Sequence, residues 1–72
     1  MTDQKRADLT LAAEAIEQLY HTISDTEVTV APDQEREFII VNVNGATYRV
    51  NVECENARAM VQSVVNETIL KI

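Results

Sequence analysis

The sequence is poor in the residues that build long loops, disulfides and membrane spans. Its 72 residues include one glycine, one proline and one cysteine. So little glycine and proline leaves little room for irregular loops, and the lone cysteine, Cys54, has no partner for an internal disulfide. No apolar run approaches the ~20 residues that cross a bilayer, and none forms an N-terminal signal peptide. We therefore expect one compact domain over residues 1–72, in a reducing cytosol and without a membrane partner.

Positive charge and aromatic side chains are also scarce. The chain has 6 lysines and arginines against 12 aspartates and glutamates, a net charge of −6, and it has 2 tyrosines, 1 phenylalanine and no tryptophan. A nucleic-acid-binding protein must neutralise phosphates with lysine and arginine, and a base-stacking platform needs several aromatic rings. The composition therefore argues against direct binding of DNA or RNA.

The excess of acid lies in the first half of the chain. Residues 7–35 hold seven acids and no lysine or arginine, whereas residues 38–72 hold three acids and three bases. Negative surface charge is a common means of keeping a protein soluble, and this is one interpretation of the excess. The other interpretation is electrostatic attraction to a basic partner protein.

Two amphipathic helices are predicted. Apolar residues recur at steps of three and four over residues 4–23, with Asp3 as the candidate N-cap, and over residues 56–71, with Asn56 as the candidate N-cap. The buried arc of the first helix is predicted to hold Leu9, Ala12, Ala13, Ile16, Leu19, Tyr20 and Ile23, with Leu11 alone on the opposite face. The arc of the second is predicted to hold Ala57, Met60, Val61, Val64, Val65, Thr68, Ile69 and Ile72.

A β-hairpin over residues 38–52 is the clearest local signal. Two β-rich runs flank Asn44-Gly45, the pair that best tolerates the positive φ angles of a type I′ turn. The two-residue loop fixes a register that pairs Val43 with Ala46, Val41 with Tyr48, Ile39 with Val50 and Glu37 with Val52. One face of the hairpin is then apolar and is predicted to be core, together with Val28 and Val30. The other face is polar except for Phe38 and Ile40.

A third strand is predicted before the hairpin. Residues 27–31 alternate polar and apolar side chains, and Pro32-Asp33-Gln34 is typical of a turn. The alternative is one long loop over residues 24–36 and a two-stranded sheet. We favour three strands, because an isolated hairpin is only marginally stable in water. The predicted fold class is α+β, a two-layer α-β-β-β-α arrangement with both helices on one face of a three-stranded antiparallel meander.

No set of residues predicts catalysis, a metal site or a cofactor. Cys54 lies near the start of the second helix, an environment typical of reactive thiols, but no histidine or lysine is close to it in the sequence, and apolar packing is the commoner fate. His21, the one histidine, falls on a polar helix face one turn from Glu17 and is interpreted as a solvated surface residue. The carboxylates show no calcium-loop spacing. We therefore expect a protein that is not an enzyme.

Two surfaces are candidates for binding a partner protein. The first is an acidic band around the first strand and its turn, which presents a row of negative charge and consists of Asp25, Glu27, Asp33, Glu35 and Glu37. The second is the apolar pair Phe38 and Ile40 on the open face of the sheet, flanked by Arg36 and Arg49, where a partner or a second copy of the chain can pack. The alternative for this pair is a local cover by the loop after the first strand or by a bent N-terminus.

The order of elements in a short, acidic chain resembles the small phage-encoded type II-A anti-CRISPR proteins. The resemblance covers most of the chain and is one of topology and charge, with no shared motif. It implies a non-enzymatic inhibitor that occupies the PAM-reading cleft of Cas9 as a DNA mimic, with Asp33, Glu35 and Glu37 meeting the arginines that read guanines. The helix-hairpin-helix core is also similar to the phage head–tail joining protein W, although that protein is basic. The alternative function is a homo-oligomeric structural or phage assembly module that uses Phe38 and Ile40 on the open face of the sheet.

Overall fold

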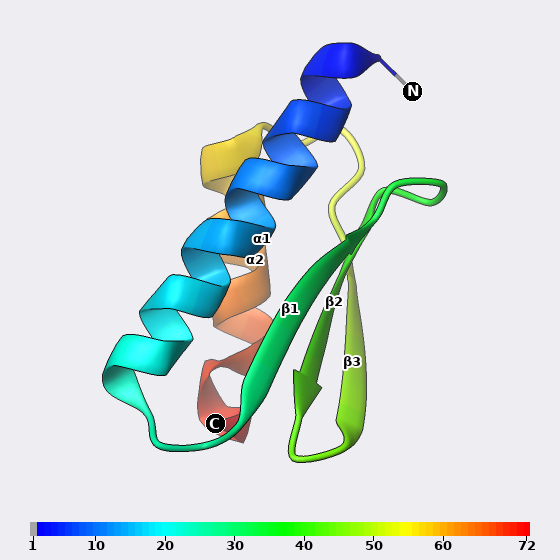
Figure 1. Ribbon diagram of the computed structural model, residues 1–72. Coiled ribbons are helices and arrows are strands. Elements are labelled where there is room, and N and C mark those ends of the chain that lie inside the picture. The colour runs from blue at the N-terminus through cyan, green and yellow to red at the C-terminus, as the bar shows by residue number, and fades with distance from the viewer. Residues whose placement is uncertain (1) are drawn as a thin grey trace.

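A layer of helices covers one face of a three-stranded antiparallel sheet in the computed structural model, which describes residues 2–72 (Figure 1). The elements follow one another as α1 (Asp3–Ile23), β1 (Val28–Asp33), β2 (Phe38–Val43), β3 (Ala46–Asn51), α2 (Ala57–Thr68) and the short 3₁₀ helix η1 (Ile69–Lys71). α1 packs mainly on β1, and α2 packs on β3 and beside α1, so both helices lie on the same side of the sheet. The predicted α-β-β-β-α fold is confirmed, and the two-stranded alternative is wrong.

Each of the two long helices begins at a side-chain cap. Asn56 caps α2 as predicted, because its Oδ1 accepts a hydrogen bond from the backbone N–H of Ala59 at 2.9 Å. The cap of α1 is Thr2, whose Oγ1 accepts from the N–H of Lys5 at 3.1 Å, so the prediction of Asp3 is wrong. Asp3 is the first helical residue instead, where a carboxylate is favourable beside the free N–H groups of the first turn.

The β2–β3 hairpin has the predicted register. The facing pairs are Ile39–Val50, Val41–Tyr48 and Val43–Ala46. Asn44 and Gly45 join the strands with φ angles of 50° and 89°, both positive as a type I′ turn requires. Beyond the strand ends, the N–H of Val52 donates to the carbonyl of Glu37 at 3.0 Å, so the fourth predicted pair is also in contact.

β1 is longer than predicted and contains residues that were expected to form its turn. Pro32 pairs with Ile39 and Asp33 pairs with Phe38, and the chain turns over residues 34–37 instead. Proline is tolerated because β1 is an edge strand, where a backbone position without an N–H can face away from the sheet. The predicted turn is therefore wrong and lies further along the chain.

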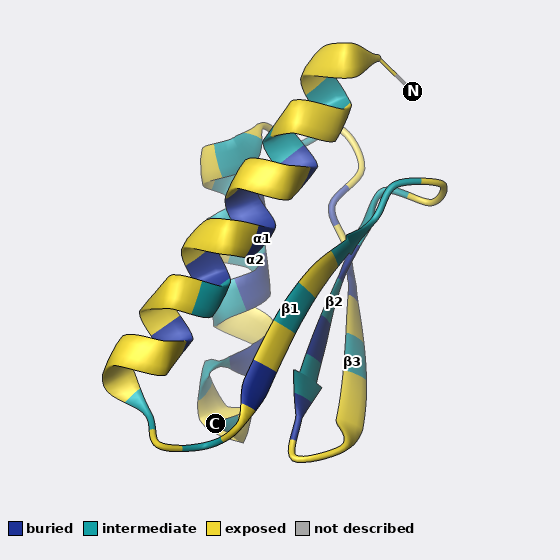
Figure 2. Ribbon diagram, viewed as in Figure 1, coloured by how far each residue is buried: buried dark blue, intermediate teal, exposed yellow. Residues whose placement is uncertain are grey.

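The core lies between the helices and the inner face of the sheet. Its buried members (Figure 2) are Leu9, Ala12, Ile16, Tyr20, Val28, Ile39, Val41, Val43, Val50, Val52, Met60 and Val64. Of the sheet residues predicted for the core, Val30, Ala46 and Tyr48 are less buried than expected. Ala46 is exposed because it lies at the hairpin turn, at the end of the sheet, and Tyr48 is half-buried with the ammonium of Lys71 5.7 Å from its ring centre.

The helices bury narrower arcs than predicted. Leu19 and Ile23 of α1 are 39% and 52% exposed, although the apolar spacing placed both in the core. Leu11, at 59% exposed, is not isolated either, because steps of four residues connect it through Ala15 to Leu19 and Ile23 on one flank of the helix. The apolar arc is wider than the area that the sheet and α2 cover, so its edge remains on the surface.

A buried hydrogen bond joins the two long helices inside the core. The hydroxyls of Tyr20 and Thr68 are bonded to each other, and Thr68 Oγ1 also donates to the carbonyl of Val64 at 2.7 Å. Because a threonine hydroxyl has one proton and Val64 receives it, Tyr20 is the donor to Thr68. Without Thr68 the tyrosine hydroxyl thus has no hydrogen-bond acceptor, whereas without the tyrosine hydroxyl Thr68 still donates to Val64.

Thr68→Val is therefore expected to destabilise the protein more than Tyr20→Phe. Thr68→Val leaves the Tyr20 hydroxyl buried without an acceptor, a cost of about 2 kcal/mol, whereas Tyr20→Phe leaves Thr68 bonded to Val64 and costs about 1 kcal/mol. Denaturation in urea measures the free energy of unfolding of both variants. Equal losses, or a larger loss for Tyr20→Phe, would show that the tyrosine hydroxyl has another acceptor.

Candidate partner-binding surface

The outer face of the sheet is covered by neither helix. The strand pairing arranges its side chains in three rows that run from β1 to β3. The rows are Asp33-Phe38-Asn51, Ala31-Ile40-Arg49 and Thr29-Asn42-Thr47, and we call these nine residues the open face. Its first two rows combine apolar and charged groups, and the third row is polar and lies next to the hairpin turn.

Phe38 and Ile40 lie at the centre of the open face. Both are half-buried, and both have a neighbour on each side because β2 is the central strand. The expected alternative of a cover by a bent N-terminus is not what the structure has. The N-terminal residues form α1 on the opposite face, and the turn after β1 is tied to α1 by a hydrogen bond of 3.2 Å from Gln34 Nε2 to Thr10 Oγ1. Phe38 and Ile40 therefore remain accessible to a partner.

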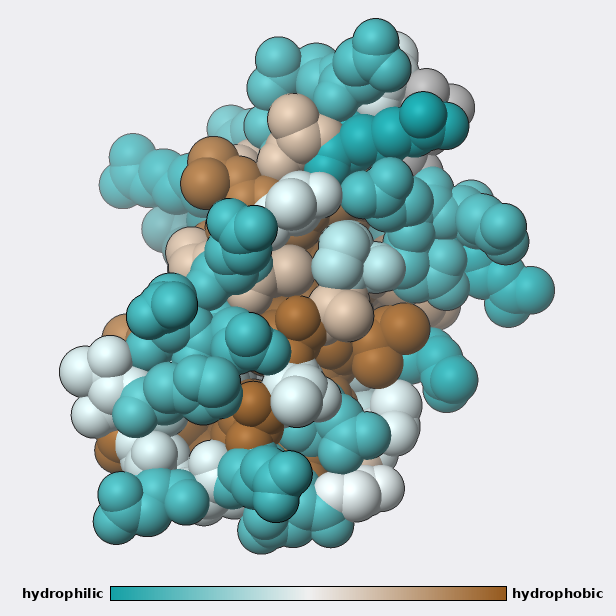
Figure 3. All heavy atoms as spheres, in the orientation of Figure 1, coloured by the Kyte–Doolittle hydropathy of each residue, from teal (hydrophilic) through white to brown (hydrophobic). Residues whose placement is uncertain are grey.

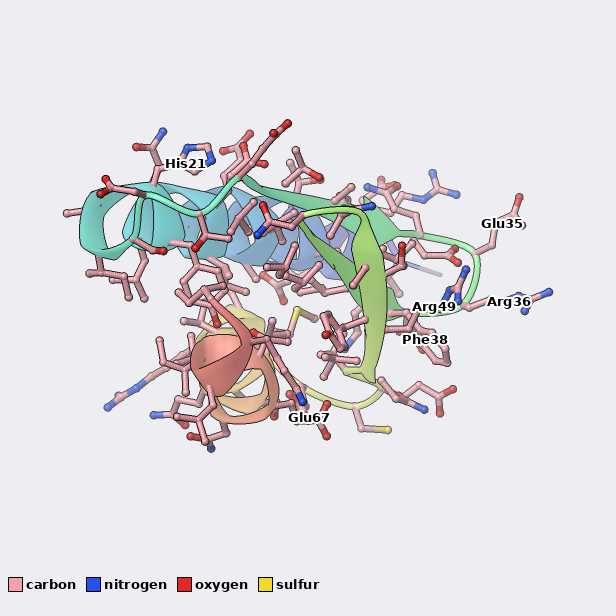
Figure 4. The ribbon with its side chains drawn as sticks, turned by 90° about the horizontal axis from the view of Figure 1, so that it is seen from below. His21, Glu35, Arg36, Phe38, Arg49 and Glu67 are labelled. Atoms are coloured by element: carbon pink, nitrogen blue, oxygen red, sulfur yellow. The ribbon has the colours of Figure 1, made fainter. Side chains whose placement is uncertain are left out.

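Two arginines flank this apolar pair. Arg49 lies directly opposite Ile40, and Arg36 lies in the turn before β2. Both are exposed, and Figure 4 shows them with Phe38 on the side of the sheet that faces away from α2. Within residues 2–72 the one ion pair joins Lys5 to Glu37, so neither arginine has a carboxylate partner. The structure thus brings together Phe38, Ile40 and Arg49 as the sequence predicted.

The predicted acidic band is divided into two groups. Asp25 and Glu27 precede β1, at the end of the sheet that holds the hairpin turn, and the carbonyl of Glu27 accepts from the N–H of Asn44 at 3.1 Å. Asp33 and Glu35 lie at the other end of β1, and Figure 1 shows the two connections at opposite ends of the sheet. A six-residue strand separates its ends by ~20 Å. The prediction of one continuous band is therefore wrong.

Two of the carboxylates in and beside the turn over residues 34–37 have local partners. Asp33 Oδ1 accepts from the N–H of Glu35 at 3.1 Å, and Glu37 Oε1 lies 3.9 Å from the ammonium of Lys5. The same ammonium donates to the carbonyl of Glu55 at 2.7 Å, which holds it in place. Glu35 is exposed and points into solvent in Figure 4, so it is the most accessible acid of this group.

A contact that the sequence did not predict closes the outer edge of β1. The Nε2–H of His21 donates to the carbonyl of Val28 at 2.8 Å, and Glu17 Oε1 accepts from the N–H of Val30 at 2.8 Å. An uncovered strand edge is a template for unwanted strand pairing, and these two side chains of α1 occupy it. Their one-turn spacing just before an alternating strand is the sequence signal for this contact, although the polar helix face on which both lie favours exposure to solvent.

The one cysteine and the groups that could hold a metal ion are the remaining candidates for chemistry. Cys54 is exposed in the connection between β3 and α2, with a positive φ of 62°. Among the residues that the structure describes, no group of three or more histidine, cysteine, aspartate or glutamate side chains is placed to hold a metal ion. Over the same residues 2–72, neither long helix combines the length and apolar character that a bilayer span needs.

A hollow of about 320 Å³ lies beside the hairpin turn. It is lined by Glu27, Thr29, Asn42, Asn44 and Gly45.

Comparison of the chain with protein-family models, with curated proteins and with solved structures finds no match.

Proposed function

We propose that this chain is a non-enzymatic protein-binding module of the cytoplasm, which binds a partner protein through the open face of its sheet. The observation that carries the proposal is the position of Phe38 and Ile40 at the centre of a sheet face without helix cover, with Arg49 beside Ile40. Aromatic residues and arginine are enriched in the centres of protein interfaces, because they combine a large contact area with directed hydrogen bonds.

The charges around the apolar pair favour a partner segment that carries both carboxylates and apolar side chains. Arg36 and Arg49 lack an ion pair within residues 2–72, although the chain has 12 acids against 6 bases. A partner carboxylate at either arginine forms a charge-assisted hydrogen bond, and an apolar side chain against Phe38 excludes water from it. The polar row of Thr29, Asn42 and Thr47 suits the rim of such an interface.

Affinity capture from the native host, quantified by mass spectrometry, tests this proposal. The baits are the unchanged chain, Arg49→Glu, and Leu70→Glu as the matched control, because Leu70 is 93% exposed and lies outside the sheet. We expect a partner that Arg49→Glu fails to retain and that Leu70→Glu retains. If Arg49→Glu retains every protein that the unchanged chain captures, the open face is not the binding surface.

Inhibition of a nucleic-acid-binding effector is the second candidate, and the acidic turn supports it. Asp33, Glu35 and Glu37 gather at one end of the sheet, with Glu35 projecting into solvent. Clustered carboxylates can imitate the phosphates of DNA and meet the arginines with which an effector such as Cas9 reads its target. On this candidate the chain is a phage or mobile-element inhibitor of the anti-CRISPR kind.

Charge reversal at Glu35 separates the two candidates. Asp33 and Glu37 have local partners, so Glu35→Lys is the reversal that disturbs the turn least. Binding by acidic mimicry is lost with Glu35→Lys and kept with Arg49→Glu. Binding through the open face is kept with Glu35→Lys and lost with Arg49→Glu. Titration of the captured protein with the two purified variants measures which of these patterns holds.

A further inference from the structure

A second surface lies on the other side of the molecule, where α1 and α2 run side by side in the same direction (Figure 1). A groove of about 450 Å³ opens between them and is lined by Leu19, Val61, Gln62, Val65 and Asn66. Gln62 and Asn66 stand on the side of α2 opposite to its buried Met60 and Val64, as the helical spacing requires. The groove therefore faces away from the sheet and from the open face.

An exposed apolar stripe on α1 continues the groove. Its members are four residues apart and are Leu11, Ala15, Leu19 and Ile23. Three of the four large apolar side chains that are exposed among residues 2–72 belong to this stripe. In Figure 3 separate apolar groups reach the surface along the left edge of the molecule, between hydrophilic side chains. We call the stripe together with Val61 and Val65 the helix face.

The helix face is free of acids at its centre. Arg58 is the one charged side chain among the residues that lie one helical turn from Leu19, Val61 or Val65. These residues are Ala15, Ile16, Thr22, Ile23, Ala57, Arg58, Gln62, Val64, Thr68 and Ile69. The acids nearest to the helix face are Asp8 and Glu14, one helical turn from Leu11 at its end. Two copies of a strongly negative protein repel each other least where each presents such a surface.

We propose that the helix face is the surface through which two copies of this chain associate. A two-fold interface requires one surface to carry both projecting groups and the hollow that receives them. The helix face meets this requirement, because Leu11 and Ile23 project at 59% and 52% exposure while the groove beside Leu19 is the hollow. Face-to-face packing of the two helix layers buries the stripe and leaves both open faces outward.

The size of the chain also favours a second copy. A domain of about 70 residues buries only about 60% of the surface of its unfolded chain, so its stability margin is small. A standard interface covers about 800 Å² of each partner, roughly a sixth of the 4600 Å² exposed by this chain. The association therefore adds the apolar burial that the single chain lacks.

Sedimentation equilibrium over a range of concentrations tests the proposal. We expect a monomer–dimer equilibrium whose dissociation constant rises by roughly 1000-fold in Leu19→Glu, because each dimer loses two central leucines and an interface anchor is worth about 30-fold. Thr47→Glu, which adds the same charge at an exposed position of the open face, is expected to leave the constant unchanged. Circular dichroism checks that each variant is folded, and Ile23→Glu, at a half-exposed position, is the second variant.

Other outcomes overturn the proposal. A chain that remains monomeric at its highest soluble concentration has no such interface. A dimer that persists in folded Leu19→Glu and Ile23→Glu associates elsewhere, and a dimer broken by Phe38→Asp uses the open face. These readouts are independent of partner capture, so failure here leaves the proposed function standing.

Discussion

Phe38→Asp is expected to weaken partner binding by roughly 100-fold while the protein stays folded. Phe38 lies between Asp33 and Asn51 in its row, and it is the one aromatic residue of the open face. The substitution removes the apolar anchor and places a second carboxylate beside Asp33, where the proposed partner brings acidic groups of its own. The cost to folding is smaller, about 1 kcal/mol, because Phe38 is only half-buried.

Calorimetric titration of the captured partner with the purified variant measures this effect, and thermal unfolding measures the folding cost in parallel. Leu70→Asp is the control, because it introduces the same charge in place of a large apolar residue far from the open face. An unchanged dissociation constant in folded Phe38→Asp would remove the open face from consideration. A large loss of stability would leave the binding result without meaning, and Arg49→Glu then replaces it.

Tyr20→Ala is expected to remove about 3–5 kcal/mol from the free energy of unfolding. A chain of 72 residues has a total of about 4–11 kcal/mol, so this one change takes between about a quarter and all of it. Tyr20 is 0% exposed, and its hydroxyl donates to Thr68 across the junction of α1 and α2. The substitution therefore leaves both a cavity in the core and a lost hydrogen bond between the helices.

Thermal unfolding followed by circular dichroism measures this loss. We expect the midpoint to fall by about 15 °C or more, because 1 kcal/mol corresponds to about 4–8 °C in a domain of this size. Leu70→Ala, which truncates a 93% exposed leucine, is expected to change the midpoint little. A fall of only a few degrees in Tyr20→Ala would mean that the helices are held together without the tyrosine.

The hairpin was predictable because local rules determine it. Asn44-Gly45 demands a type I′ turn, and the two-residue loop then fixes which residues face each other. Because side chains alternate between the two faces of a strand, this register correctly placed Phe38 and Ile40 on one face with Arg49. The end of β1 was not predictable in the same way, because Pro32 is acceptable in a strand only when that strand is at an edge, and strand order is a tertiary property.

The positions of the other surface residues could not be predicted, because they depend on tertiary packing and not on the spacing of residue types along the chain. Periodicity gives the direction of a helix's apolar arc but not its covered width, so Leu19 and Ile23 were expected in the core and lie on the surface. The acids at the two ends of β1 are close in sequence, yet the extended strand keeps them apart. The role of Glu17 and His21 depends on β1 running alongside α1, which only the folded chain reveals.

Mapping of amide chemical shifts tests the binding of a partner by the open face most directly. Isotope-labelled protein is titrated with the captured partner, and the shift of each backbone amide is followed. We expect the largest changes in residues 38–42 and 47–51, the parts of β2 and β3 that carry Phe38, Ile40 and Arg49. Changes centred on the acidic turn at residues 33–37, or on the helix face, with β2 and β3 unmoved, would contradict it.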